Sequence, residues 1–235
     1  MEKEEKVAKK QTKEIQEKKH IGWRLLGIIL VMCVTIFIII LLRRFFILNT
    51  YAIAMAEYSK KDNYSITLYE NQPTENSIIS QSYYKDGKKV FILQPSENKK
   101  MHSYCDKEQW IVKIDNDQNK VALVSKKIAT VTGPVVVSAF GEGMSAWQNF
   151  LLSFTTQITE EECNGKDCYK VDLDGMQVWI DKETYLTARI ANGYLQNSDG
   201  TKELAATNYE YKFGTVTDAQ VAKPDLTGYS VREQK

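Results

Sequence analysis

The stretch Asn63-Tyr-Ser-Ile-Thr-Leu-Tyr-Glu70 alternates apolar and polar side chains and introduces the pattern of the chain that follows it. Tyr64, Ile66 and Leu68 fall on one side of this alternation, and Ser65 and Thr67 fall on the other. A repeat of two residues is the period of a β-strand with one buried face. The sequence therefore predicts a sheet that begins near residue 63.

Further apolar runs follow at the spacing of β-hairpins. Asp86-Gly87 separates the runs 78–84 and 90–93, and Asp174-Gly175 separates two alternating runs at 169–173 and 176–180. Asp-Gly is a preferred pair for two-residue hairpin turns. Other expected strands are residues 110–114, 121–124, 189–196 and 209–213. Short strands at this spacing indicate an antiparallel, strongly curved sheet.

Two segments carry a helical pattern. Residues 51–59 are rich in alanine, and they either continue a preceding helix or start a new one. Residues 144–154 place Trp147, Phe150, Leu151 and Phe154 at helical spacing, which fits core packing against the sheet or a plug inside its curve. The predicted fold class is α+β: one transmembrane helix, then a curved antiparallel sheet (a half-barrel) with one or two helices on its concave face.

Upstream of the sheet, residues 25–42 form a run of 18 residues without a charge. A helix needs roughly 17 to 25 apolar residues to cross a bilayer. With the flanking Trp23, we predict a transmembrane helix at 23–46. The charge segregation around this run is hidden in the totals of 31 Lys+Arg and 30 Asp+Glu over 235 residues.

The orientation of this span follows from its flanking cations. Residues 1–24 hold eight Lys and Arg, whereas the 20 positions after Leu42 hold four. Since cations accumulate on the cytoplasmic side, we expect a charged cytoplasmic tail at 1–22. The β-rich domain at 50–230 is expected to be extracytoplasmic. Ala54-Met55-Ala56 also has the small-x-small form of a signal-peptide cleavage site, but its distance from the apolar run favours an uncleaved anchor.

The order of elements resembles the LolA-like lipoprotein-carrier superfamily, which includes LolA, LolB, the LprG/LppX carriers and RseB. Residues 51–59 lead directly into Asp62-Asn-Tyr-Ser-Ile-Thr-Leu68, as a helix leads into the first strand of that family. Asp174-Gly-Met-Gln-Val-Trp-Ile-Asp-Lys-Glu-Thr-Tyr-Leu-Thr-Ala-Arg189 is similar to the family's tryptophan-bearing strand and turn, although Thr187 replaces its usual proline. Residues 208–226 resemble its final strand and tail.

The resemblance implies a hydrophobic cavity that holds an acyl chain or a lipoprotein. That chemistry is diffuse, so no individual residue of the family is carried over, and the cavity candidates are the large aromatic residues Trp110, Trp147, Phe150, Phe154 and Trp179. A tethered chain does not shuttle, which favours a receiving or sensing role. The alternative is a non-enzymatic envelope sensor or protein-interaction module that holds no ligand.

The cysteines outside the span suggest a redox-dependent feature. Cys163-Asn-Gly-Lys-Asp-Cys168 sets two thiols across a short turn, which predicts a disulfide in an oxidising compartment. A metal site at this pair lacks a nearby histidine. Cys105 is then expected to be a buried thiol.

Other chemistry finds little support in the sequence. The formal net charge of +1 argues against nucleic acid as a partner. His102 is the one histidine after the span, so it would have to carry any Ser-His-Asp or Cys-His mechanism alone. We therefore expect no enzymatic activity, no cofactor and no metal.

Overall fold

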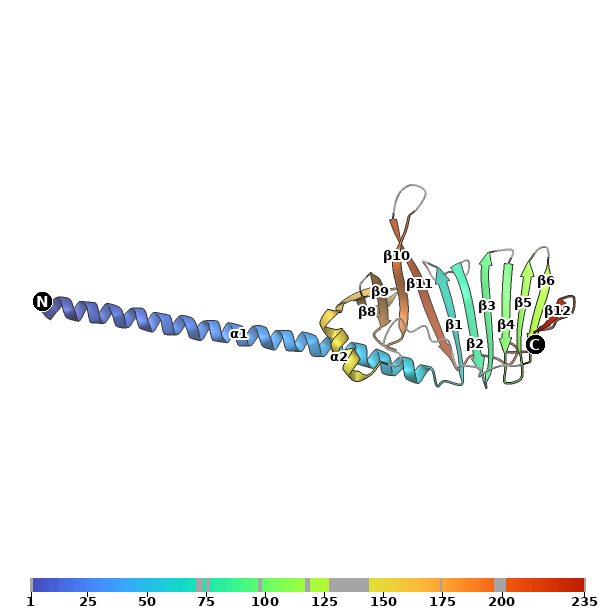
Figure 1. Ribbon diagram of the computed structural model, residues 1–235, viewed down its shortest axis with the longest axis horizontal. Coiled ribbons are helices and arrows are strands. Elements are labelled where there is room, and N and C mark those ends of the chain that lie inside the picture. The colour runs from blue at the N-terminus through green and yellow to red at the C-terminus, as the bar shows by residue number, and fades with distance from the viewer. Residues whose placement is uncertain are drawn as a thin grey trace. The chain divides into compact units, whose positions relative to one another are not determined.

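The computed structural model describes residues 2–70, 74, 77–96, 99–116, 119–126, 144–173, 175–196 and 202–234 (Figure 1). Contacts between residues divide the chain into two compact units, Met1–Ile47 and Leu48–Lys235. The first unit contains most of one long helix, and the second contains the end of that helix and the sheet.

The long helix α1 runs without a break from Glu2 to Tyr58. Residues 51–59 therefore continue the apolar helix and do not start a new one. Its segment Trp23–Tyr58 is long and apolar enough to cross a membrane, with a mean hydropathy of 3.4 in its most apolar window. Side chains such as Leu26 and Leu30 are 60% and 65% exposed, as expected of a candidate membrane span or signal anchor.

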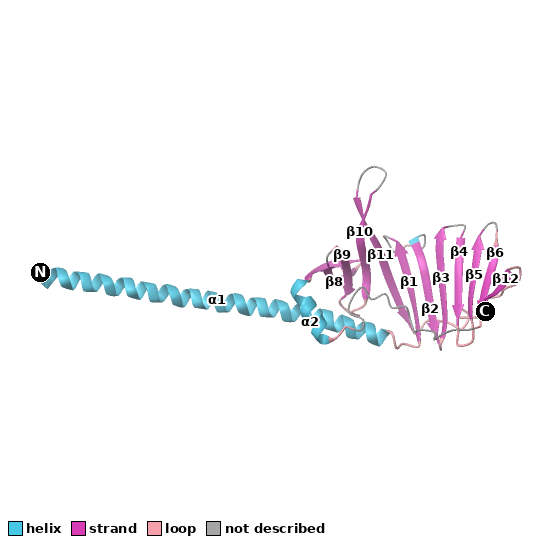
Figure 2. Ribbon diagram, in the orientation of Figure 1, coloured by secondary structure: helices cyan, strands magenta, loops and turns pink. Residues whose placement is uncertain are grey.

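The sheet is a single open, curved layer, which confirms the predicted fold class (Figure 2). Its spatial order is β12-β6-β5-β4-β3-β2-β1-β11-β10-β9-β8-β7. All neighbours pair antiparallel except β12 and β6, which are parallel. The strands are β1 (Asn63–Glu70), β2 (Ile78–Lys85), β3 (Lys88–Ser96), β4 (Lys99–Cys105), β5 (Trp110–Asn116), β6 (Lys120–Ser125), β7 (Gln157–Cys163), β8 (Lys166–Leu173), β9 (Met176–Asp181), β10 (Thr187–Gln196), β11 (Lys202–Phe213) and β12 (Ser230–Gln234).

The strand register defines two faces of the sheet. Val90 lies opposite Tyr83 and Tyr104, whereas its neighbour Phe91 lies opposite Ser82 and Ser103. Because successive side chains point to opposite faces, we call these the Val90 face and the Phe91 face. The same register carries both faces across β1 to β6.

The chain after β11 covers the Val90 face. Val216 and Val221 pack with Val90, Tyr104 and Ile111 in one buried cluster. Residues 214–229 thus form a strap across β3, β4 and β5, and the chain then pairs β12 with β6.

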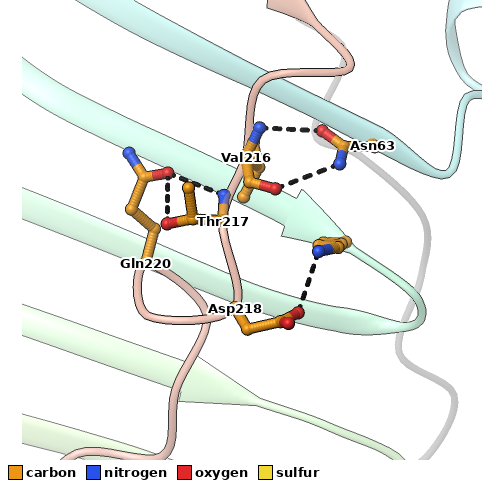
Figure 3. Close-up of polar contacts among 6 residues, drawn as sticks. Asn63, Val216, Thr217, Asp218 and Gln220 are labelled. Carbon is orange, nitrogen blue, oxygen red and sulfur yellow. Dashed lines mark hydrogen bonds and ion pairs between the residues drawn. The ribbon is translucent and has the colours of Figure 1, made fainter.

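Asn63, the first residue of β1, fixes the start of this strap (Figure 3). Its amide nitrogen Nδ2 donates to the Val216 carbonyl at 3.1 Å, and its Oδ1 accepts from the Val216 N–H at 2.9 Å. Lys85 pairs with Asp218 at 2.8 Å, and Gln220 Oε1 accepts from the Thr217 N–H at 2.9 Å. The side-chain amide therefore completes both hydrogen bonds of a buried backbone unit.

The last turns of α1 pack on the Phe91 face at β1 and β11. Tyr51 and Met55 are fully buried, and the Tyr51 and Thr187 hydroxyls are hydrogen-bonded at 2.9 Å. The Tyr58 ring lies 4.9 Å from the Tyr64 ring and 5.2 Å from that of Tyr211. The final helical segment is thus part of the core of the sheet domain.

The short helix α2 (Ala146–Thr155) corrects one expectation. Ser145 caps it, and the Ser145 and Gln148 side chains form a capping box. Its buried residues are Asn149 and Ser153, which are spaced four apart. The aromatic stripe expected in the core lies outside it instead, with Trp147 and Phe154 exposed by 65% and 49%.

Candidate functional site

The Phe91 face of β3 to β6 presents two adjacent rows of apolar side chains, which we call the apolar face. One row holds Phe91, Val112 and Leu123, with Ser103 between them, and the next holds Leu93, Met101, Ile114 and Val121. All seven apolar side chains are half-buried. The face is therefore apolar yet retains accessible surface.

The opposite side of the same strands differs sharply. Val90, Ile111 and Ala122 are buried to 1% exposure or less, and Val216 and Val221 of the strap pack with Val90 and Ile111. Each is followed directly by a half-buried apolar residue of the apolar face. The strands therefore carry two apolar faces, one of which is sealed.

Trp110 is the one predicted cavity residue that lies beside the apolar face. It pairs with Cys105 and Ser125, in the row before that of Val112. Its indole Nε1 donates to Ser103 Oγ at 2.7 Å, and the side chain is 46% exposed. The hydrogen bond holds the ring at the border of the apolar face.

The other predicted cavity residues lie elsewhere. Trp147, Phe150 and Phe154 form their own ring cluster on α2: Trp147 stacks on Phe150 with centroids 5.5 Å apart, and Phe154 meets Phe150 edge to face at 5.2 Å. Trp179 lies on the Val90 side of the sheet, since it pairs with Arg189 and that residue pairs with Asn208. The structure does not bring these residues together with Trp110, and a role for any of them in binding a ligand stays a prediction.

Trp179 has a structural role instead. It is 3% exposed and packs with Cys163, Cys168 and Ala191. Its Nε1 donates to Glu161, and the Arg189 guanidinium carbon lies 4.9 Å from the ring centroid. Such a cation–π contact stabilises the buried ring.

A hollow of about 460 Å³ lies where β11 separates from β10. Beyond Asn208, β11 pairs with β1 but has no described pairing with β10. The lining of the hollow mixes charged groups with apolar and aromatic side chains such as Leu186, Tyr209 and Phe213. Its charged groups are paired within the protein: Lys166 with Asp181 at 2.8 Å, Tyr69 with Glu210 at 2.7 Å and Lys212 with Glu210 at 3.2 Å. A ligand would have to compete with these bonds, so the hollow is the weaker candidate.

The predicted Cys163–Cys168 disulfide is not formed in this structure, where both residues are buried free thiols. The turn has only two residues, Asn164 and Gly165, both with positive φ. Cys163 therefore faces Lys166, and Cys168 faces Glu161, so the thiols are diagonal neighbours. A hydrogen bond from Cys168 and the nearby Arg189 lower the pKa of Cys163, whereas this bond and burial raise that of Cys168.

Within the described strands, His102 is paired with no acidic or nucleophilic residue. It lies on the Val90 face between Ile92 and Lys113. Burial lowers its pKa, and the charges of Lys113 and Lys100 lower it further. Among the described residues, no group of three or more His, Cys, Asp or Glu side chains could hold a metal ion.

Comparison with known proteins adds little to this geometry. No family model and no curated protein matches the chain. It is similar to a solved structure of a DUF1329 family protein from Desulfovibrio piger ATCC 29098, with 10% identity over 74% of this chain and 95% of that chain and a TM-score of 0.21. The resemblance to LolA-like carriers stays a prediction, although the open curved sheet that it implies is present.

Proposed function

We propose that this protein is a membrane-anchored, extracytoplasmic binding protein that holds the acyl chain of a lipid or lipoprotein against its apolar face. The observation that carries this proposal is that two adjacent rows of apolar side chains remain half-buried. These side chains are Phe91, Leu93, Met101, Val112, Ile114, Val121 and Leu123. Apolar area removed from water contributes roughly 25 cal/mol per Å². A lipid chain on this face would bury both its own surface and that of these side chains.

The dimensions of the apolar face suit one acyl chain. The strands β3 to β6 are consecutive neighbours, and three gaps of about 4.8 Å span about 14 Å. One leaflet of a bilayer core, about half of 30 Å, has a similar thickness of about 15 Å. A single chain lying across these four strands would contact both rows.

Tethering supports the same function. The candidate span would keep the domain beside a supply of lipid. The buried Tyr51 and Met55 favour an intact chain, because cleavage after Ala56 would remove both from the core of the sheet domain. On this proposal the domain is a binding module that receives or senses lipid while remaining attached.

The test uses the full-length chain in phosphatidylcholine nanodiscs and the methyl ester of cis-parinaric acid as a neutral fluorescent acyl chain. We expect saturable binding with energy transfer from Trp110 at the border of the face. Val112→Asp places a charge in the centre of the face and should abolish this binding. Gln94→Asp alters an exposed residue of β3 on the other face and should not.

The result that contradicts the proposal is equal binding by wild type and Val112→Asp, with circular dichroism showing that both are folded. Absence of binding to wild-type protein beyond that of empty nanodiscs would also contradict it.

A second function is favoured by α2 alone. Trp147, Leu151 and Phe154 expose 65%, 49% and 49% of their surface on a capped helix, and aromatic residues are enriched where proteins meet. On this reading the domain is an interaction or sensory module. Because such a module holds no ligand, this reading predicts that the wild-type protein binds no parinaroyl probe beyond that of empty nanodiscs.

A further inference from the structure

Lys89 lies at one corner of the apolar face. It is the residue of β3 that precedes Phe91 on the same face, and it pairs with Tyr84 on β2 and Cys105 on β4. Two residues along a strand span about 6.6 Å. The backbone of Lys89 therefore lies about 6.6 Å from that of Phe91, the first residue of the nearer apolar row.

Lys89 is also the single charge in the rows around it. Across β2 to β6, the described side chains of its own row are Tyr84, Lys89, Cys105, Trp110 and Ser125. The two following rows on these strands contain only apolar and serine side chains. Lys89 therefore places a positive charge at one end of an otherwise uncharged surface.

Among the described residues, no negatively charged group compensates the charge of Lys89. No ion pair joins it to a described carboxylate. Burial lowers its pKa, and the group that opposes this shift is the Cys105 thiol. Burial and Asp106 raise the pKa of that thiol, so it stays protonated at neutral pH and offers no countercharge. A half-buried cation without a counterion carries a desolvation cost that a bound anion would offset.

We propose that Lys89 binds the carboxylate of a free fatty acid whose acyl chain lies across the apolar face. This inference rests on the proposed function and narrows its ligand class. One lysine matches the single charge of a carboxylate, whereas a phosphate monoester carries up to two charges. The Tyr84 hydroxyl, directly across the strand pair, lies on the same face as a neutral neighbour for the head group.

The experiment uses the full-length chain in phosphatidylcholine nanodiscs, titrated with cis-parinaric acid and with its methyl ester. Lys89→Met keeps an apolar side chain of similar length but removes the charge. We expect this variant to bind the acid about tenfold more weakly, as the loss of a charge-assisted hydrogen bond implies, and the ester unchanged. Lys89→Arg should restore acid binding, and the control Lys100→Met, an exposed lysine on the other face of β4, should alter neither ligand.

The outcomes separate this inference from the proposed function. If wild type binds neither probe, the proposed function fails and this inference fails with it. If wild type binds both probes and Lys89→Met binds the acid with unchanged affinity, the apolar face stands and the role of Lys89 is overturned. Equal weakening of acid and ester also overturns it, as does displacement of the acid by lysophosphatidate at lower concentration than by oleate.

Discussion

The strap over the Val90 face should depend on one side chain, Asn63. In Asn63→Ala, the Val216 N–H and carbonyl lose their partners, which lie at 2.9 Å and 3.1 Å in the native protein. Val216 is only 4% exposed, so water cannot readily replace both bonds. We expect the variant to lose stability and to release the start of the strap.

The magnitude follows from the two hydrogen bonds. Each contributes about 1 kcal/mol net, and a buried group left without a partner costs more, so we expect a loss of about 2 to 3 kcal/mol. For a domain of this size, about 1 kcal/mol shifts the melting temperature by about 2 to 4 °C. Asn63→Ala should therefore melt about 4 to 12 °C below wild type.

The assay is thermal unfolding of the full-length protein in detergent micelles, followed by far-ultraviolet circular dichroism and by hydrogen exchange of residues 214–229. Asn63→Asp keeps the acceptor for the Val216 N–H and loses only the donor, so its effect should be smaller. Asp218→Asn removes the exposed partner of Lys85 and should leave melting unchanged. A melting temperature for Asn63→Ala within 1 °C of wild type, with an unchanged exchange rate at Val216, would refute the reasoning.

Three further predictions concern the rest of the sheet domain. Thr187→Val removes the buried partner of the Tyr51 hydroxyl and should lower the free energy of unfolding by about 1 to 3 kcal/mol in urea titrations; unchanged stability would show that the end of α1 is not held by this bond. Burial alone would raise the pKa of Asp181, but Lys166 and the N–H groups of Glu183 and Thr184 hold it below its usual 3.8. A carboxyl group with a lowered folded-state pKa stabilises the protein above its ordinary pKa of 3.8, and this stabilisation is lost as pH falls through the folded-state pKa. Asp181→Asn should therefore lose less stability than wild type between pH 5 and pH 2. Parallel curves of stability against pH for the two proteins would contradict this prediction. Cys163 and Cys168 are 3% and 0% exposed free thiols and should react with iodoacetamide only after unfolding; an intact mass lower by two hydrogens before reduction would reveal a disulfide instead.

Sequence patterns predicted the elements better than their packing. The alternation at 63–70 and the Asp86-Gly87 turn lie where the structure has β1 and the β2–β3 hairpin. The bounds of β4, β7 and β12 were not predicted, because charged and polar residues interrupt Lys99–Cys105, Gln157–Cys163 and Ser230–Gln234. In these strands, pairing with neighbours outweighs the weak local preference.

The candidate site was accessible to sequence reasoning only in part. Val90-Phe-Ile-Leu93 and Val121-Ala-Leu-Val124 are continuous apolar runs that do not alternate, which is typical of strands with two apolar faces. That signal points to the strands of the apolar face. The choice of single aromatic residues as cavity candidates drew attention to Trp147 and Trp179, whose surroundings depend on neighbours far away in the chain.

The sequence by itself determined the apolar helix and the run of hairpins, because both depend on patterns within a few residues: an uncharged stretch at 25–42 and a period of two from residue 63 onward. Only the tertiary structure decided which side of the doubly apolar strands the described residues cover. Residues 214–229 return over more than a hundred positions to cover Val90 and Ile111. Burial is a property of what packs against a side chain, so local sequence could show that both faces are apolar but not which one is covered.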